Sequence, residues 1–303
     1  MTVFPTGDPR ATLTAPPPAS AAAVAGADYV RFTAPAEHQD ALGATWIARA
    51  QNIVIVYSDV SDGWRAERHE QADEYIVLLP DAATSATVVA AGETREVAGD
   101  SLTIVPPGDS RVTVHGAGQV VRVFTASSTD LAEAAVNADS YRLPHPAVAP
   151  LTPWPDPVGG PRIRSYGLDV ASQPGRFGRI WRSSAMMINL IQTDGPRDTT
   201  RLSPHHHDDF EQCSLAVTGD FVHHLRWPWT SDLAEWREDD HEHLPAPSLA
   251  VIPPPAIHTT QSIGTGEHRL FDIFSPPRLD FSMKPGWVLN ADEYPLPDGG
   301  ASR

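Results

Sequence analysis

The sequence contains a single cysteine, Cys213, among its 303 residues. No disulfide can therefore form within the chain, and a metal site built from several thiolates is excluded. No apolar run approaches the ~20 residues that a membrane-spanning helix needs. The first residues also lack the basic and apolar segments of a secretory signal. We therefore expect a soluble, cytoplasmic protein without a membrane partner.

Basic residues are scarce as well. The chain has 22 lysines and arginines against 38 aspartates and glutamates, which gives a formal net charge of −16. A surface that binds phosphates needs a basic patch, so we expect no nucleic-acid partner. The sequence also lacks a glycine-rich phosphate loop and a G-x-S-x-G element for a serine nucleophile. The sequence therefore offers no nucleotide-binding loop or serine-hydrolase motif as a competing site.

Helical periodicity is rare, and residues 129–138 form the one convincing helical pattern. Most apolar residues lie instead in short β-branched runs that are bounded by Gly, Pro, Asp and Ser. Such runs are typical of strands in a sandwich or barrel, so the pattern predicts an all-β fold. The runs span residues 52–58, 74–79, 86–92, 101–108 and 119–125 in the first half, and 185–192, 213–219, 220–227, 248–254 and 268–275 in the second.

The composition predicts four segments. We expect an arm at 1–27, rich in Ala, Pro and Thr, a first β unit at 28–145 and a Pro/Gly-rich connector at 146–176. A second β unit with a C-terminal tail follows at 177–303. The tail predicts either a homodimer contact or a segment that folds back over its own barrel.

The two halves share a short pattern. Residues 99–111 (GDSLTIVPPGDSR) align without a gap on residues 246–258 (APSLAVIPPPAIH). The alignment matches Ser-Leu, the apolar run and Pro-Pro, which suggests duplication of one β unit. It also places Arg111 at the position of His258.

Three consecutive histidines, 205–207, precede Glu211 in the second half, and His258 follows a proline turn about fifty residues later. Alternate residues of a strand share a face, so the first and third of these histidines can bind one ion together. His258 would add a third imidazole, and a nearby carboxylate would complete the site. Such a ligand set suits Fe, Mn, Ni, Cu, Co or Zn and does not decide among them.

These motifs resemble those of the cupins, and the two halves resemble a two-domain cupin. The first cupin motif is His-x-His, three or four residues, Glu, six residues and Gly; the second is Gly, five residues, Pro-x-Gly, two residues and His. The matching residues here are His205, His207, Glu211, Gly219, Pro253 and His258. The resemblance implies tandem double-stranded β-helix (jelly-roll) barrels and one divalent transition metal, with Fe(II) favoured.

The match departs from the motifs at the acidic ligand and at the second turn. Seven residues separate Glu211 from Gly219, and a strict six-residue spacing would put Gln212 at the ligand position. We favour Glu211, because a carboxylate is the better ligand; Gln212 then becomes a candidate substrate contact. Pro255 and Ala246 replace two glycines of the second motif without removing a ligand.

The first half carries a decayed version of the same motifs. Glu67, His69 and Glu74 have the spacing of the first motif, and Arg111 replaces the final histidine. A fixed cation opposes a divalent ion and can pair with a glutamate instead. We expect a structural role for this half.

The strand after Gly219 contains His223 and His224, one of which should face the barrel interior. We expect His224 to act as a proton shuttle or pocket wall, although a satisfied core histidine fits equally well. Arg226 lies on the same face as His224, so it is a candidate for holding an anionic substrate. The alternative is a surface arginine that packs on a nearby tryptophan.

Three functions follow from the resemblance. The leading hypothesis is an Fe(II)-type dioxygenase acting on a small organic substrate, acidic substrates included, with Glu211 or a nearby histidine accepting a proton. The second is a metal-dependent isomerase, decarboxylase or lyase acting on a sugar acid or hydroxy acid. The third is a barrel that binds a small ligand without catalysis, since one fold hosts many functions.

Overall fold

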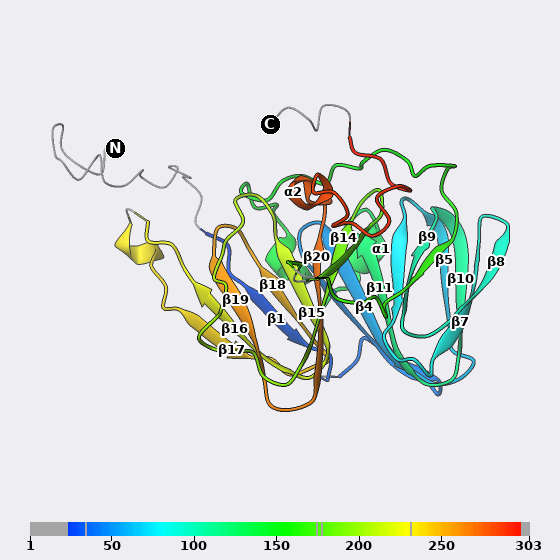
Figure 1. The fold of residues 1–303 in the computed structure, drawn as a ribbon, viewed down its shortest axis with the longest axis horizontal. Coiled ribbons are helices and arrows are strands. Elements are labelled where there is room, and N and C mark those ends of the chain that lie inside the picture. The colour runs from blue at the N-terminus through cyan, green and yellow to red at the C-terminus, as the bar shows by residue number, and fades with distance from the viewer. Residues whose placement is uncertain (1–23, 34, 174, 177, 231, 298–303) are drawn as a thin grey trace.

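The computed structural model describes residues 24–297 except 34, 174, 177 and 231. The predicted N-terminal arm lies almost wholly outside the described residues. Antiparallel sheets make up most of the molecule, and the described part contains no helix that is long and apolar enough to cross a membrane. Figure 1 shows the sheets side by side, with the few helical turns at the periphery.

The first half of the chain builds a seven-stranded and a four-stranded sheet. The large sheet has the order β12-β9-β6-β11-β4-β3-β2, and the small sheet has the order β5-β10-β7-β8. Their strands are β2 (His38–Gln39), β3 (Gly43–Arg49), β4 (Ile53–Val60), β5 (Arg65–Gln71), β6 (Tyr75–Leu79), β7 (Ser85–Ala90), β8 (Glu93–Val97), β9 (Ser101–Val105), β10 (Gly108–His115), β11 (Gly118–Thr125) and β12 (Arg164–Gly167).

The second half builds a six-stranded sheet, β1-β18-β15-β20-β14-β13, and a three-stranded sheet, β17-β16-β19. Their strands are β1 (Asp28–Arg31), β13 (Arg179–Arg182), β14 (Met187–Asp194), β15 (Gln212–Thr218), β16 (Asp220–Arg226), β17 (Asp240–His243), β18 (Ser248–Ile252), β19 (Ile257–Ile263) and β20 (Glu267–Phe274).

The two large sheets share one strand order. The first large sheet begins β12-β9-β6-β11-β4, and the second begins β1-β18-β15-β20-β14. Strands at the same place in the two orders correspond to each other. The aligned segments 99–111 and 246–258 therefore occupy equivalent places. Each contains the second strand of a large sheet and continues into a strand of the neighbouring small sheet. The predicted repeat in sequence is thus also a repeat in topology.

Each half contributes an edge strand to the other half. β1, which we expected in the first unit, pairs with β18, with Asp28 opposite Val251. β12, which we expected in the connector, pairs with β9, with Arg164 opposite Ile104. Both exchanges satisfy backbone N–H and C=O groups that an edge would otherwise leave open. The predicted boundaries did not anticipate this exchange, because a four-residue strand carries almost no pattern of its own.

The two large sheets pack face to face through a continuous apolar core. In β15, Cys213, Leu215 and Val217 point into this core, and the β15 residues between them point the other way. Both faces of β15 are therefore covered, and all of its residues except Thr218 are buried. Members of the core from the first half include Ile53, Ile55, Tyr57, Ile76, Leu78, Leu102, Ile104, Val121 and Val123; those from the second include Trp181, Ile188, Leu190, Leu249, Val251, Phe271 and Ile273.

The two pairs of sheets differ in what fills the space between them. In the first pair, large apolar side chains such as Trp64, Tyr75 and Phe124 form a second core. Arg122 is buried among them with its guanidinium over the Trp64 and Phe124 rings, and burial lowers its pKa to about 10. In the second pair, the corresponding interior holds polar side chains around a cavity. Among the described residues, the space between the sheets is therefore open in the second pair and filled by apolar side chains in the first.

Helices are few and short. The predicted helix at 129–138 begins as expected, but α1 spans only Thr129–Ala134 and a 3-10 turn, η2, follows at Ala138–Tyr141. The other turns are η3 (Leu233–Glu235) and α2 (Leu279–Ser282). The C-terminal tail folds back on the chain: Glu293 pairs with Arg164, and the Tyr294 hydroxyl donates to Glu74. The homodimer stays a prediction.

Candidate metal centre

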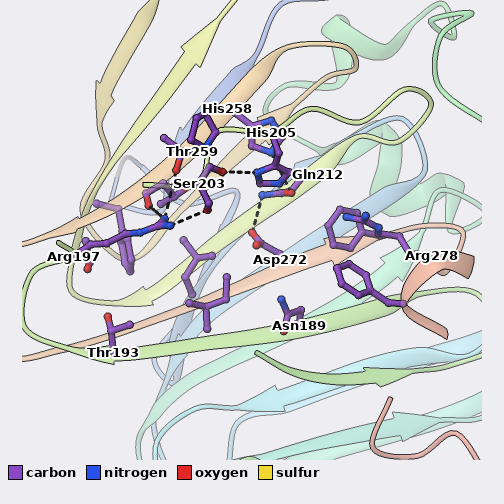
Figure 2. Close-up of a pocket in the computed structure, with 18 of the residues that line it drawn as sticks. Asn189, Thr193, Arg197, Ser203, His205, Gln212, His258, Thr259, Asp272 and Arg278 are labelled. Carbon is purple, nitrogen blue, oxygen red and sulfur yellow. Dashed lines mark hydrogen bonds between the residues drawn. The ribbon is translucent and has the colours of Figure 1, made fainter. Parts of the chain in front are cut away.

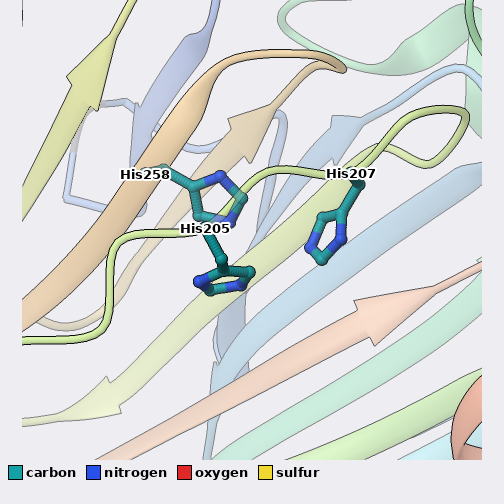
Figure 3. A group of neighbouring side chains, drawn as sticks. All are labelled: His205, His207 and His258. Atoms are coloured by element: carbon teal, nitrogen blue, oxygen red, sulfur yellow. The ribbon is translucent and has the colours of Figure 1, made fainter.

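Three histidines converge between the large and small sheets of the second half (Figure 3). The candidate ligand nitrogens of His205, His207 and His258 all lie within 4.8 Å of one another. His258 lies on β19, and two backbone hydrogen bonds of 2.7 and 3.0 Å join it to His205. His205 and His207 lie in the loop before β15, where we expected a regular strand. The isolated bridge to His258 fixes that loop in place.

Backbone carbonyls orient two of the rings. His258 Nδ1 lies 3.0 Å from the Ala256 carbonyl oxygen, and His205 Nδ1 lies 2.9 Å from that of Ser203. A carbonyl only accepts, so each Nδ1 carries the proton and each Nε2 keeps its lone pair. This is the arrangement that metal-binding histidines commonly adopt.

Burial favours the neutral form of two of the three histidines. It lowers the pKa of His207 to about 3, with the Arg278 cation adding to the effect. It also lowers the pKa of His258 to about 4. Neutral imidazoles are the form that binds a metal. His207 and His258 are therefore in the form that binds a cation at neutral pH.

The structure does not bring Glu211 to the histidines. Its carboxylate is buried and accepts a hydrogen bond of 2.7 Å from the backbone N–H of Gln51, in the first half of the chain. Glu211 lies one residue before β15 and has the same parity as Cys213, so it faces the core between the large sheets. Burial raises its pKa to about 7.

Gln212 occupies the position next to the cluster instead. Its Oε1 lies 3.0 Å from His207 Nε2 and 3.3 Å from His258 Nε2. Side chains alternate along β15, so only one of Glu211 and Gln212 can face the histidines. Gln212 points into the cavity, and Glu211 points away from it. The six-residue spacing of the cupin motif indicated this residue, and the structure places it beside the histidines where we had preferred Glu211. The donors that face one another are three imidazoles and one amide oxygen, a set that suits a divalent transition metal.

A row of polar residues continues from Gln212 across the sheet (Figure 2). The Gln212 Nε2 donates to Asp272 Oδ1 at 3.0 Å, and the Ser214 hydroxyl donates to the same oxygen at 2.6 Å. Asn189 lies opposite Asp272 on β14. Burial raises the pKa of Asp272 to about 6.

His205 and His258 line a cavity of about 760 Å³ together with Gln212, Asp272 and Asn189 of this row. This volume lies in the range that encloses drug-sized ligands. The apolar part of the wall comprises Ile191, Phe221, Leu270, Phe274 and Phe281. The cations among the lining residues are Arg197, Arg278 and Lys284.

The structure reverses the expected orientation of β16. His224 lies on its outer face, where Nδ1 contacts His241 at 2.8 Å and Nε2 contacts Gln261 at 3.1 Å. Arg226 has the same parity, is exposed and forms an ion pair of 2.8 Å with Asp239. His223 is the inward residue; it is fully buried, and its Nδ1 contacts the Thr260 hydroxyl. Neither His224 nor Arg226 lines the cavity, because the apolar neighbours Phe221 and Leu225 set the buried face of the strand.

Three cavity residues, Arg197, Asp272 and Arg278, were missed by sequence reasoning. Arg197 precedes the histidine run by eight residues, and Arg278 follows β20 in a proline-rich turn. Asp272 interrupts the apolar run of β20, and this interruption was the one available signal. The two arginines carried none, since charged residues in loops usually face solvent.

The first half brings no comparable cluster together among the described residues. Glu67 and His69 are exposed on β5, and Arg111 lies opposite Glu67 on β10. Glu74 is buried elsewhere and accepts hydrogen bonds from the backbone and hydroxyl of Ser184. Apolar side chains fill the interior of this half, and its structural role stays a prediction.

No protein-family model and no curated protein sequence matches the chain. Solved structures do resemble it. A Bacillus subtilis oxalate decarboxylase studied for its Mn(II) centres is 12% identical, with a TM-score of 0.57 over 89% of this chain and 84% of that one. The Lactobacillus farciminis oxalate decarboxylase formate complex is 14% identical, with a TM-score of 0.56 over 82% and 86%. AerE from Microcystis aeruginosa is 7% identical, with a TM-score of 0.52 over 84% and 98%.

At such low identity these similarities show the fold and nothing finer. The chain has a cupin fold of antiparallel jelly-roll sheets, as the two motifs predicted.

Proposed function

We propose that this chain is a two-domain cupin enzyme that binds one divalent transition metal through His205, His207, His258 and Gln212. The observation that carries the proposal is the convergence of these donors beside a cavity of about 760 Å³. The shared strand order of the two large sheets supports the duplication. The first domain acts as a structural partner, and the second holds the site.

The reaction that we favour is dioxygenation of a small organic substrate, with Fe(II) as the metal and Mn(II) as the alternative. The metal would supply a place where substrate and dioxygen meet. Four protein donors leave room for other ligands in an octahedral site, and three imidazoles and an amide oxygen bring no negative charge to it. The site therefore keeps the full charge of the cation, which favours an anionic substrate group. The apolar wall around Leu270 and Phe274 limits the access of water.

A non-oxidative decarboxylase or isomerase is the second candidate, and Asp272 favours it. This carboxylate lines the cavity beside Gln212, and its raised pKa of about 6 suits proton transfer to or from carbon. An assay without oxygen separates the two reactions, since only the dioxygenase must stop.

The first experiment measures metal by mass spectrometry on untagged protein and on the His205→Ala and His258→Ala variants. His206→Ala is the matched control, because this exposed neighbour contacts Asp208 and lies outside the cluster. We expect about one equivalent of metal in the wild type and the control, and loss of metal in both test variants. A wild type that holds no metal after reconstitution would leave a barrel that only binds a small ligand.

A further inference from the structure

Arg197 is anchored beside the metal centre by uncharged partners (Figure 2). Its Nη1 donates to the Thr260 carbonyl at 2.7 Å and reaches the Thr259 hydroxyl at 3.4 Å. Its Nη2 donates to the Ser203 hydroxyl at 2.8 Å. The backbone N–H of Arg197 also donates to the Ser262 carbonyl. The guanidinium is therefore held in a fixed position on the cavity wall.

Within the described part of the chain, no carboxylate pairs with this cation. The other arginine of the cavity differs, because Arg278 binds both oxygens of Asp280 at 3.0 and 2.7 Å. A guanidinium has five N–H groups, and those of Arg197 that have protein partners are on Nη1 and Nη2. The Nε–H and one N–H of Nη2 are therefore left for a ligand. Side by side, such a pair matches the two oxygens of a carboxylate.

The partners of Arg197 also connect it to the histidines. Ser203 accepts from Arg197 through its hydroxyl, and its carbonyl orients the ring of His205. Thr259 directly follows His258 in β19. An anion held by Arg197 would therefore lie next to the metal centre. The substrate atoms next to its anionic group would then face the metal.

We infer that the substrate is a carboxylic acid with an apolar body, whose carboxylate pairs with Arg197; this rests on the proposed metal-dependent function. The apolar body lies along Ile191, Phe221 and Leu270, which line the same cavity. A space of about 760 Å³ is far larger than a two-carbon diacid requires. The substrate class therefore differs from oxalate, the small diacid in the names of two structurally similar enzymes.

The test compares binding of 3-phenylpropionate, its uncharged amide and oxalate by isothermal titration calorimetry. Each is titrated into the full-length protein with and without reconstituted Mn(II). The variants are Arg197→Gln, which removes the charge, and Arg197→Lys, which keeps the charge without the fork. Arg226→Gln is the control, because this exposed arginine lies outside the cavity. Metal content and thermal unfolding are measured on the same samples.

We expect the wild type and the control to bind the acid at least tenfold more tightly than the amide, and to bind oxalate more weakly than the acid. Arg197→Gln should abolish the preference for the acid and keep the wild-type metal content, and Arg197→Lys should be intermediate. An Arg197→Gln variant that keeps the preference overturns the inference, as does a wild type that does not distinguish acid from amide. If Arg197→Gln fails to fold, Arg197→Lys gives the answer. An unchanged preference for the acid in Arg197→Lys would overturn the pairing of the carboxylate with two guanidinium N–H groups.

Metal content judges the proposed function separately. If the wild type prefers the acid but cannot hold metal, the role of Arg197 is supported and the proposed metal-dependent function is overturned. If the wild type holds metal but does not prefer the acid, the metal site is supported and the role of Arg197 is overturned.

Discussion

Asp272 holds the side-chain amide of Gln212 so that its oxygen faces the histidines. The Gln212 Nε2 donates to Asp272 Oδ1 at 3.0 Å, and Gln212 Oε1 lies 3.0 Å from His207 Nε2. An amide offers donors on one side and an acceptor on the other, so fixing the nitrogen fixes the oxygen. The Asp272 carboxylate thus acts on the candidate metal centre indirectly, through Gln212. The cupin motif would instead place a carboxylate in direct contact with the metal.

Gln212→Ala should weaken metal affinity by about tenfold or more, because it removes the one oxygen donor that faces the histidines. The neighbouring variant Glu211→Gln should leave affinity unchanged, since Glu211 contacts the backbone of Gln51. Titration of metal-free protein with Mn(II) or Fe(II) measures both. Loss of affinity in Glu211→Gln alone would restore Glu211 as the ligand.

Asp272→Ala should lower metal affinity by about 10- to 100-fold, the usual effect of removing a group that orients a ligand. The Gln212 amide would lose the acceptor that fixes its nitrogen and could turn its oxygen away. Asn189→Ala is the control, because Asn189 faces Asp272 across the sheet without a contact to Gln212. Equal affinities in Asp272→Ala and the wild type would show that Asp272 does not position the donor. The same metal titration gives the answer.

Glu211→Gln should stabilise the fold at alkaline pH. Burial raises the pKa of Glu211 from 4.5 to about 7, so the folded state carries no penalty below pH 4.5 and the full penalty above pH 7. The variant should gain about 1–3 kcal/mol in the free energy of unfolding at pH 8, where the wild type must bury a charge. The gain should vanish near pH 4.5. Urea unfolding of both proteins at the two pH values measures it; a gain that is independent of pH would contradict this origin.

Leu215→Ala should destabilise the protein by about 2–5 kcal/mol, because Leu215 is fully buried in the core between the two large sheets. Leu233→Ala should change stability by less than about 0.5 kcal/mol, since its side chain is 73% exposed. Chemical denaturation followed by fluorescence compares the two. A single transition for Leu215→Ala is expected as well, because this core joins both halves.

Most of the fold could be predicted from local pattern. Short β-branched runs gave the strands, and the two Ser-Leu…Pro-Pro segments gave the repeat that recurs as a common strand order. The exchanged edge strands β1 and β12 could not be predicted. Each is four residues long, and its partner is decided by which backbone edge is open in space rather than by sequence.

The site was predicted in part. The spacing of the motifs identified His205, His207 and His258, which the structure brings together. The orientation of β16 was assigned wrongly, because alternation shows which residues share a face but not which face is buried. In that strand the apolar Phe221 and Leu225 take the interior and carry His223 with them.

By itself, the sequence determined the all-β class and the three histidines, because strand patterns and ligand spacings are local properties of the chain. Tertiary structure decided which of Glu211 and Gln212 faces the histidines, and which arginines reach the cavity. The first outcome depends on what packs against each face of β15, and the second on where the loops lie against the sheets. Glu211 is taken up by the core between the large sheets, and Arg197 is brought to the cavity from a loop that no periodicity describes.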